Sequence, residues 1–282
     1  MQEKIIITSD STTDLGEELI AQYGIKILPL KVVLGDKTYA DGVDITPDMI
    51  YAHYAEKGEL PQTAAPNLAE CIDFFGALVN DGYTVIHFTI SSEMSSSCSN
   101  AVIAAQEFEN VYVVDTRNLS TGGGLLVVSA CEMAQKGMTA EEIVSQSREL
   151  ADRVSASFIV DDLTFLYKGG RCSALAALGA NLLKLKPCIE VSGGKMDVSR
   201  KYRGKFEKVL LQYIADQVGD GSRIVADHVF VTHAGCDDEI CQMCAEEVRK
   251  LVPVKQIRIT RAGCTISSHC GKNTLGVLFI RK

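Results

Sequence analysis

Three hydroxyl-rich segments occupy equivalent places in the first half of this 282-residue chain. They are TSDSTTDL (Thr8 to Leu15), TISSEMSSS (Thr89 to Ser97) and DTRNLSTGGG (Asp115 to Gly124), and each follows an apolar run and precedes a helical pattern. In an open α/β sheet such turns gather at the carboxyl edge, where ligands bind. Short hydroxyl side chains beside free helix N–H groups there form a site for an anion. Helix capping alone also places Ser, Thr and Asp in such turns, and it explains one segment more easily than all three.

Four further polar residues are predicted in loops. Thr63 lies in LPQTAAPN, where two prolines stiffen the connector and present the hydroxyl. Lys168 and Arg171 flank a glycine pair in LYKGGRCS, which predicts a mobile loop with two positive charges. His269 lies in CTISSHCGKNTLG, predicted as a turn before a final strand, where an imidazole can bind an anion or donate a proton. A structural histidine and a surface ion pair are the alternatives for these residues.

A group of residue types that bind zinc lies in the second half, at His228, His233, Cys236, Cys241 and Cys244. Cys241 and Cys244 form one C-x-x-C, but no second C-x-x-C completes a tetrahedral set. The pair falls in a helical pattern, where a spacing of three puts both thiols on one buried face. The sequence therefore favours structural thiols, and we expect no metal site.

The glycine run TGGGLL can cradle a phosphate through backbone N–H groups, but it lacks the spacing of the dinucleotide and P-loop motifs. Close packing of a helix explains it better. The chain contains no G-x-S-x-G elbow, no H-E-x-x-H and no kinase signature set. We therefore expect a binding protein without catalytic residues or a cofactor.

Apolar strand-like runs alternate with amphipathic segments through the first half. They are KIIIT, GIKILPLKVVL, TVIHFT and VYVVDT, followed in turn by DLGEELIAQYG, PDMIYAHYAEKG, SSCSNAVIAAQEF and GGLLVVSACEMAQKG. This alternation predicts a three-layer α/β/α domain with a mainly parallel sheet.

The regular alternation of predicted strands and helices ends after Arg153. A strand SASFIVD, a short helix LTFLY and a small-residue helix SALAALGANLL precede PCIEVSGGKMDVS, whose Ser-Gly-Gly predicts a hairpin turn. Strands DHVFVTH, KQIRIT and LGVLFI follow, around the helix DDEICQMCAEEVRKL. We predict a smaller α/β domain with a mixed or antiparallel sheet, and domain ranges of 1–158 and 159–282.

The composition of the chain limits which kinds of partner the protein can bind. The formal net charge is -8, which argues against nucleic acid, because binding to a phosphate backbone rests on clustered Lys and Arg. No long apolar run predicts a membrane span or a signal peptide. We expect a cytoplasmic protein that is not an integral membrane protein, with its ten cysteines reduced.

Taken in order, these motifs resemble the DegV family of bacterial fatty-acid-binding proteins. TSDSTTDL resembles the TDSxxDL opening of the family, PQTAAPN its P-x-T-S-Q-P-S loop, and ISSEMSSS its I-S-S-x-L-S-G-T segment. LTFLYKGGRCS resembles L-x-x-L-x-K-G-G-R, and SSHCGKNTLGV resembles H-T-G-P-G-x-L-G-V. The likeness spans nearly the whole chain. It departs from the family pattern at Ala64-Ala65, Ser96-Ser97 and Lys272-Asn273.

The resemblance implies two domains with a long-chain fatty acid buried between or beneath them. It implies Thr63 and Ser95 as the primary contacts of the fatty acid carboxylate, with Ser92, Ser96 and His269 nearby. It further implies a carrier that presents the lipid to the ATP-binding subunit of a separate fatty acid kinase, and it places Arg171 near the exposed head group. Lys168 is predicted beside it in the same loop.

Two alternative functions stay open at this stage. One is a small-molecule enzyme that binds a phosphorylated substrate through the TGGG and KGGR loops. The other is a cysteine-rich regulatory protein that binds zinc.

Overall fold

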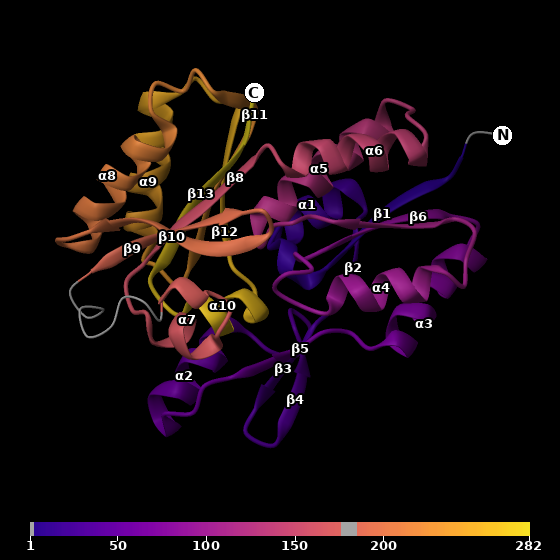
Figure 1. The fold of residues 1–282 in the computed structure, drawn as a ribbon, viewed down its shortest axis with the longest axis horizontal. Coiled ribbons are helices and arrows are strands. Elements are labelled where there is room, and N and C mark those ends of the chain that lie inside the picture. Colours follow the sequence, from indigo (N-terminus) through magenta and orange to yellow (C-terminus); the bar gives the residue numbers. More distant parts are fainter. Residues whose placement is uncertain (1–2, 176–184) are drawn as a thin grey trace.

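The computed structural model describes residues 3–175 and 185–282 (Figure 1). The first sheet is wholly parallel, because α1, α3 and α4 each return the chain to the start of its next strand. Its strand order is β2 (Lys26–Leu28), β1 (Ile5–Asp10), β6 (Thr84–Thr89) and β7 (Val111–Asp115). The short helix η1 (Ser11–Thr13) follows β1 at the carboxyl edge.

Helices cover both faces of this sheet, which makes the predicted three layers (Figure 1). One face packs against α3 and α4 through a cluster that includes Phe75 and Ala101. The other face packs against α1, α5 and α6 through a cluster that includes Leu19 and Ile143. The bounds are α1 (Gly16–Tyr23), α3 (Leu68–Asn80), α4 (Ser97–Ala105), α5 (Thr121–Gln135) and α6 (Ala140–Ala151).

The second sheet is mixed, as predicted. Its order is β10 (Lys195–Tyr202), β9 (Lys186–Ser192), β8 (Val154–Val160), β13 (Thr274–Arg281), β11 (Ile224–Ala234) and β12 (Gln256–Arg261). Only β11 and β12 pair in parallel. The helices α8 (Phe206–Val218) and α9 (Asp238–Leu251) cover one face. Residue 158 falls inside β8, and the domain ranges of 1–158 and 159–282 stay a prediction.

Helix α5 lies between the two sheets and packs against both. Every residue from Thr121 to Val128 is buried, which is the pattern of a helix without a solvent face. The glycine run at its start permits this close approach, because a Cβ on Gly122 would meet Asn118 Oδ1 at 2.9 Å. The packing interpretation of TGGGLL is therefore confirmed.

A small third sheet was not predicted. It comprises β4 (Lys37–Ala40), β3 (Lys31–Leu34) and β5 (Gln62–Ala64), and α2 (Pro47–Lys57) follows β4. The run GIKILPLKVVL is two strands because Pro29 has no N–H to continue a ladder, and Gly35 then turns the chain at a φ of 56°. The segment read as a loop, LPQTAAPN, contributes β5, which pairs Thr63 with Val32 of β3.

Two site residues lie in helices instead of loops. Lys168 is in the last turn of α7 (Thr164–Gly169), and His269 is in α10 (Cys264–Cys270). Helix α8 also went unrecognised. The Ser-Gly-Gly hairpin is confirmed, with Gly193 and Gly194 both at positive φ. The helix predicted over SALAALGANLL lies mostly outside the described residues, and none of the described helices is long and apolar enough to cross a bilayer.

Two helix-interior glycines test how tightly α5 is packed. A Cβ on Gly124 would stand 2.7 Å from both Leu15 Cδ2 and the Thr13 carbonyl oxygen, whereas a Cβ on Gly76 of α3 would meet Phe108 at 3.6 Å. We expect Gly124→Ala to lower the free energy of unfolding by about 1–3 kcal/mol through overpacking. Gly76→Ala should be neutral or stabilising, because Ala favours a helix by about 1 kcal/mol over Gly.

Denaturant unfolding of the two variants measures both effects. Similar changes for Gly124→Ala and Gly76→Ala would contradict the close contact between α5 and the turn after β1.

Candidate functional site

A cavity of about 310 Å³ opens where α10, the small sheet, the β6–α4 connection and β10 meet. Its apolar lining residues are Leu30, Ala64, Ala65, Ile90, Met94, Leu119, Met196, Ile266 and Cys270. Its polar lining residues are Thr63, Ser95, Ser96, Arg171, Thr265 and His269. The buried part of this lining is apolar except for the Cys270 thiol and the Thr265 hydroxyl, while the exposed Ser96 and Arg171 lie on its rim. Such a gradient suits a ligand with an apolar body and a polar end.

Thr63 and His269 come from different elements and meet in this cavity. The Thr63 Oγ1 to His269 Nε2 distance is 2.8 Å. Burial, together with the positive charge of Arg171, lowers the pKa of His269 to about 4, so the imidazole is neutral at pH 7. In the tautomer with its proton on Nε2, His269 donates to Thr63, and the Thr63 proton is then free for an acceptor in the cavity.

The serines after β6 do not all point the same way. Ser95 and Ser96 line the cavity just before α4, and Ser95 Oγ accepts from Ser97 N at 3.2 Å. Ser92 does not line it; its hydroxyl donates to Asp115 Oδ2 at 2.6 Å. A direct contact between Ser92 and the fatty acid carboxylate therefore stays a prediction that this geometry does not favour.

The two cationic residues of the KGGR segment lie in different places relative to the cavity. Arg171 lines the rim of the cavity, and its guanidinium donates to the Gly169 carbonyl oxygen at 2.8 Å. Gly170 ends α7 in the left-handed region, at a φ of 70°, and so directs Arg171 away from the helix. Lys168 is exposed on α7 and does not line the cavity.

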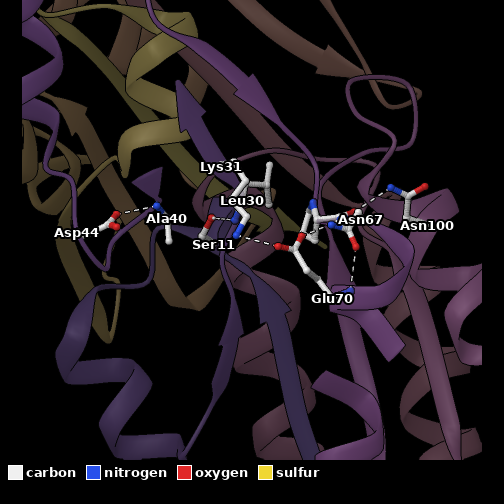
Figure 2. Close-up of polar contacts among 9 residues, drawn as sticks. Ser11, Leu30, Lys31, Ala40, Asp44, Asn67, Glu70 and Asn100 are labelled. Carbon is white, nitrogen blue, oxygen red and sulfur yellow. Dashed lines mark hydrogen bonds and ion pairs between the residues drawn. The ribbon is translucent and has the colours of Figure 1, made fainter. Parts of the chain in front are cut away.

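Figure 2 shows polar contacts that join the segments beside the strand of Thr63 to α3 and α4. Lys31 of β3 pairs with Glu70 of α3 at 2.9 Å. Glu70 also forms a capping box with Asn67 at the start of α3. Asn100 of α4 donates to the Pro66 carbonyl oxygen at 2.8 Å. The wall of the cavity around Thr63 is thereby tied to α3 and α4.

The first N–H groups of α10 donate to two buried carboxylates. Asp14 Oδ1 accepts from Gly263 N at 2.8 Å. The two oxygens of Asp41 accept from Cys264 N at 2.7 Å and from Thr265 N at 3.0 Å. Burial raises the pKa of Asp14 well above its ordinary range, although these hydrogen bonds oppose the shift. Asp14 follows β1 and Asp41 follows β4, so α10 is held by two other parts of the fold.

A second, much smaller cavity, of about 30 Å³, lies beyond the first. The two share Leu119, Ile266 and Cys270, and the second is bounded further by Phe158 and Leu278 of the mixed sheet. Its walls are mostly apolar, and the Thr232 hydroxyl there already pairs with Thr121 and Thr260. The two cavities are therefore adjacent, and the second lies on the side of the mixed sheet.

The residues considered for zinc have other partners. All ten cysteines are free and buried. Cys241 and Cys244 share the buried face of α9, as the helical spacing predicted. His228 Nε2 contacts Glu132 Oε1 at 2.8 Å, linking β11 to α5. Within residues 3–175 and 185–282, no three His, Cys, Asp or Glu side chains are grouped as metal ligands.

Sequence patterns missed several lining residues. Leu119, Met196 and Thr265 carry no local signal, because tertiary contacts alone bring them to the cavity. Thr265 lies four residues before His269 on α10, and this spacing would have placed the two on one face had α10 been recognised as a helix.

Over residues 4–282 the chain matches a family model described as "Uncharacterised protein, DegV family". This chain belongs to the DegV family. A DegV domain-containing protein of Caldanaerobacter subterraneus subsp. tengcongensis is 32% identical, over 99% of this chain and 100% of its own length. One from Clostridium acetobutylicum is 33% identical, over 99% of each chain.

Solved DegV structures share the whole fold. A DegV family protein of Thermus thermophilus, described as fatty acid binding, has a TM-score of 0.90 at 28% identity and covers 99% of this chain and 100% of its own. DegV of Bacillus subtilis, described as a fatty acid binding protein, has a TM-score of 0.85 at 27% identity, over 99% and 100%. A stearic acid-binding protein of Eubacterium ventriosum has a TM-score of 0.87 at 26% identity, over 99% and 98%. The family assignment and the two-sheet fold expected from the sequence are confirmed.

The burial of His269 predicts a pH dependence of stability. Its pKa is near 6.5 in the unfolded chain and about 4 in the folded one. Between these values the unfolded chain binds more protons, so stability is complete above pH 6.5 and falls as the pH drops toward 4. We expect His269→Gln to lose less stability between pH 7 and pH 4 than the parent, by on the order of 2–3 kcal/mol.

Urea unfolding at several pH values measures how the free energy of unfolding depends on pH in the parent and in His269→Gln. Burial also lowers the pKa of His87, to about 3, and this residue serves as an internal control because it contributes equally to both proteins. Parallel stability curves for parent and variant would contradict a half-buried His269 that is neutral at pH 7.

Proposed function

We propose that this protein binds a long-chain fatty acid in the 310 Å³ cavity, with the carboxylate at Thr63 and Ser95 and the tail along the buried apolar wall. The observation that carries the proposal is the gradient of the lining, from a hydroxyl-rich rim to an apolar interior. The fatty acid binding described for structures with the same fold supports it.

The rim supplies hydrogen-bond donors without a buried positive charge. Thr63 and Ser95 each carry a hydroxyl, His269 is neutral at pH 7, and Arg171 is exposed. Hydrogen bonds from neutral donors to a carboxylate are charge-assisted and therefore strong. A permanently charged partner buried at this position would carry a large desolvation penalty whenever the site is unoccupied.

The buried wall supplies the affinity. A methylene contributes about 0.8 kcal/mol when it leaves water, so a tail of a dozen or more methylenes contributes on the order of 10 kcal/mol. The shared residues Leu119, Ile266 and Cys270 lead from the main cavity to the second one, and this is the route we propose for the end of the tail. The polar rim then sets the orientation of the fatty acid, and the apolar interior sets how tightly it binds.

Uptake of oleate or palmitate by purified, delipidated protein tests this function. We expect Thr63→Val and Ser95→Ala each to weaken binding by about 1–3 kcal/mol, the scale of a hydrogen bond to a charged acceptor. Ser92→Ala is the matched control, because the Ser92 hydroxyl bonds Asp115 and lies outside the cavity lining. Mass spectrometry of lipid extracts from untreated protein gives a second readout.

Failure of the parent to take up either fatty acid, together with extracts free of fatty acid, would refute the function. Normal binding by folded Thr63→Val and Ser95→Ala would instead refute the assignment of the carboxylate contacts.

We further propose that the protein has no catalytic step of its own and presents the carboxylate to an ATP-using fatty acid kinase. An acyl group held by its tail, with its carboxylate at an exposed rim, is accessible to a second protein. Arg171 is exposed on that rim, and its planar guanidinium can pair bidentately with a phosphate or with a carboxylate of the partner. Lys168, exposed one turn before it, adds positive charge to the same surface.

One variant distinguishes presentation of the fatty acid to the kinase from binding of the fatty acid. We expect Arg171→Ala to leave fatty acid affinity nearly unchanged and to slow acyl-phosphate formation with the cognate kinase subunit about tenfold or more, the scale of a lost hydrogen bond to a charged group. Arg249→Ala, an exposed Arg on α9 outside the cavity, is the control. Unchanged phosphorylation by Arg171→Ala would exclude the presentation role, and lost lipid binding would move Arg171 into the carboxylate site.

A further inference from the structure

Two methionines form part of the apolar wall of the cavity. Met94 lies in the turn before α4, and Met196 is the second residue of β10. Both are buried, and both belong to the apolar side-chain cluster that also contains Ile90, Leu119 and Ile266 of the same lining. The wall is therefore made of two kinds of side chain, branched aliphatic ones and unbranched thioethers.

The two methionines enter the wall where a turn of the parallel sheet meets the hairpin of the mixed sheet. They directly follow Glu93 and Lys195, whose side chains form an ion pair at 3.2 Å. Ser91 Oγ of the first segment also donates to the Gly194 carbonyl oxygen of the second at 2.7 Å. These two contacts bring both methionines to the same junction.

The junction is joined by few interactions. Among the described strands no ladder crosses it, because β10 is the outer strand of the mixed sheet and pairs only with β9. The ion pair of Glu93 and Lys195 is exposed and contributes little to stability. In contrast, Ile90 N donates to the buried carboxylate of Asp10 at 2.8 Å, and Ile266 lies within α10. The wall is therefore less restrained at the methionines than at the two isoleucines.

A methionine side chain changes shape at little cost. It is unbranched and has many accessible rotamers, so it fills irregular space and re-packs around different ligands. A β-branched side chain such as isoleucine has few accessible rotamers. Methionines at a weakly joined part of the wall thus allow the cavity to widen locally while the rest of the wall keeps its shape.

We propose that Met94 and Met196 let the cavity accept straight and cis-unsaturated acyl chains with similar affinity. The inference rests on the proposed fatty acid function of this cavity. A cis double bond bends the chain, and a bent chain needs more width than a straight one. A wall of fixed shape excludes the wider chain, whereas the methionines re-pack around either.

Oleate and elaidate test this inference on the full chain, because they differ only in the cis or trans geometry of their double bond. The parent should bind them within about threefold of each other, since re-packing of methionine costs little. Met94→Ile and Met196→Ile should each bind oleate about tenfold more weakly than elaidate, because a stiffer wall excludes the wider chain. Met243→Ile, on α9 and outside the lining, is the matched control and should keep the ratio of the parent.

Two further measurements make the test independent of how well the isoleucine variants fold. Met94→Leu and Met196→Leu conserve volume and should shift the ratio in the same direction by a smaller factor. Methyl NMR spectra of the parent with isotopically labelled methionines report re-packing directly. The methyl resonances of Met94 and Met196 should differ between the oleate and elaidate complexes, and that of Met243 should coincide.

The outcomes separate this inference from the proposed function. A parent that prefers either lipid by about tenfold or more overturns the inference while fatty acid binding stands. An unchanged ratio in both the isoleucine and the leucine variants, or methyl spectra that coincide in the two complexes, overturns it in the same way. Failure of the parent to bind either lipid refutes the proposed function and this inference with it.

Discussion

Two buried carboxylates hold the start of α10, and the cavity depends on them. Asp14 comes from the turn after β1 and Asp41 from the end of the small sheet, yet both accept N–H groups at the same helix end. Free N–H groups and the helix dipole make that end favourable for negative charge, which offsets part of the desolvation of the two acids. The same helix carries four lining residues, so the wall around His269 forms only when the parallel sheet, the small sheet and the end of β12 have come together.

Helix α5 imposes the second constraint, because it is a layer common to both sheets. Its buried start contacts the turn after β1 on one side and β8 on the other, which leaves little room for the two sheets to slide past each other. Leu119 lies just before this helix and lines both cavities. The tail route that we propose therefore runs beside this closely packed junction, whereas Ser96 and Arg171 of the rim lie next to the ends of α4 and α7.

Local patterns in the sequence predicted the two-sheet α/β fold. Together with the family resemblance they also pointed to five residues that line the cavity, Thr63, Ser95, Ser96, Arg171 and His269. Strand and helix periodicity identified most elements because each buries one face or both. The patterns failed where a contact distant in sequence decides the structure. Helix α10 is too short to be stable alone and exists through Asp14 and Asp41. The strand of Thr63 has only three residues and is defined by its pairing with β3. Ser92 lies in the same serine run as Ser95, but Asp115 from the neighbouring strand β7 takes its hydroxyl.

The position of α10 also determines the electrostatics at the rim of the cavity. His269 stays neutral because α10 places it in a half-buried position near the exposed Arg171, so both the low polarity around it and the guanidinium oppose a second positive charge. A neutral imidazole leaves Thr63 able to donate without a fixed charge in the cavity. The guanidinium is exposed at the rim and available to another molecule, although its charge also reaches His269. In the function that we propose, the neutral groups Thr63 and Ser95 hold the carboxylate, and the exposed Arg171 carries the charge that a partner protein contacts.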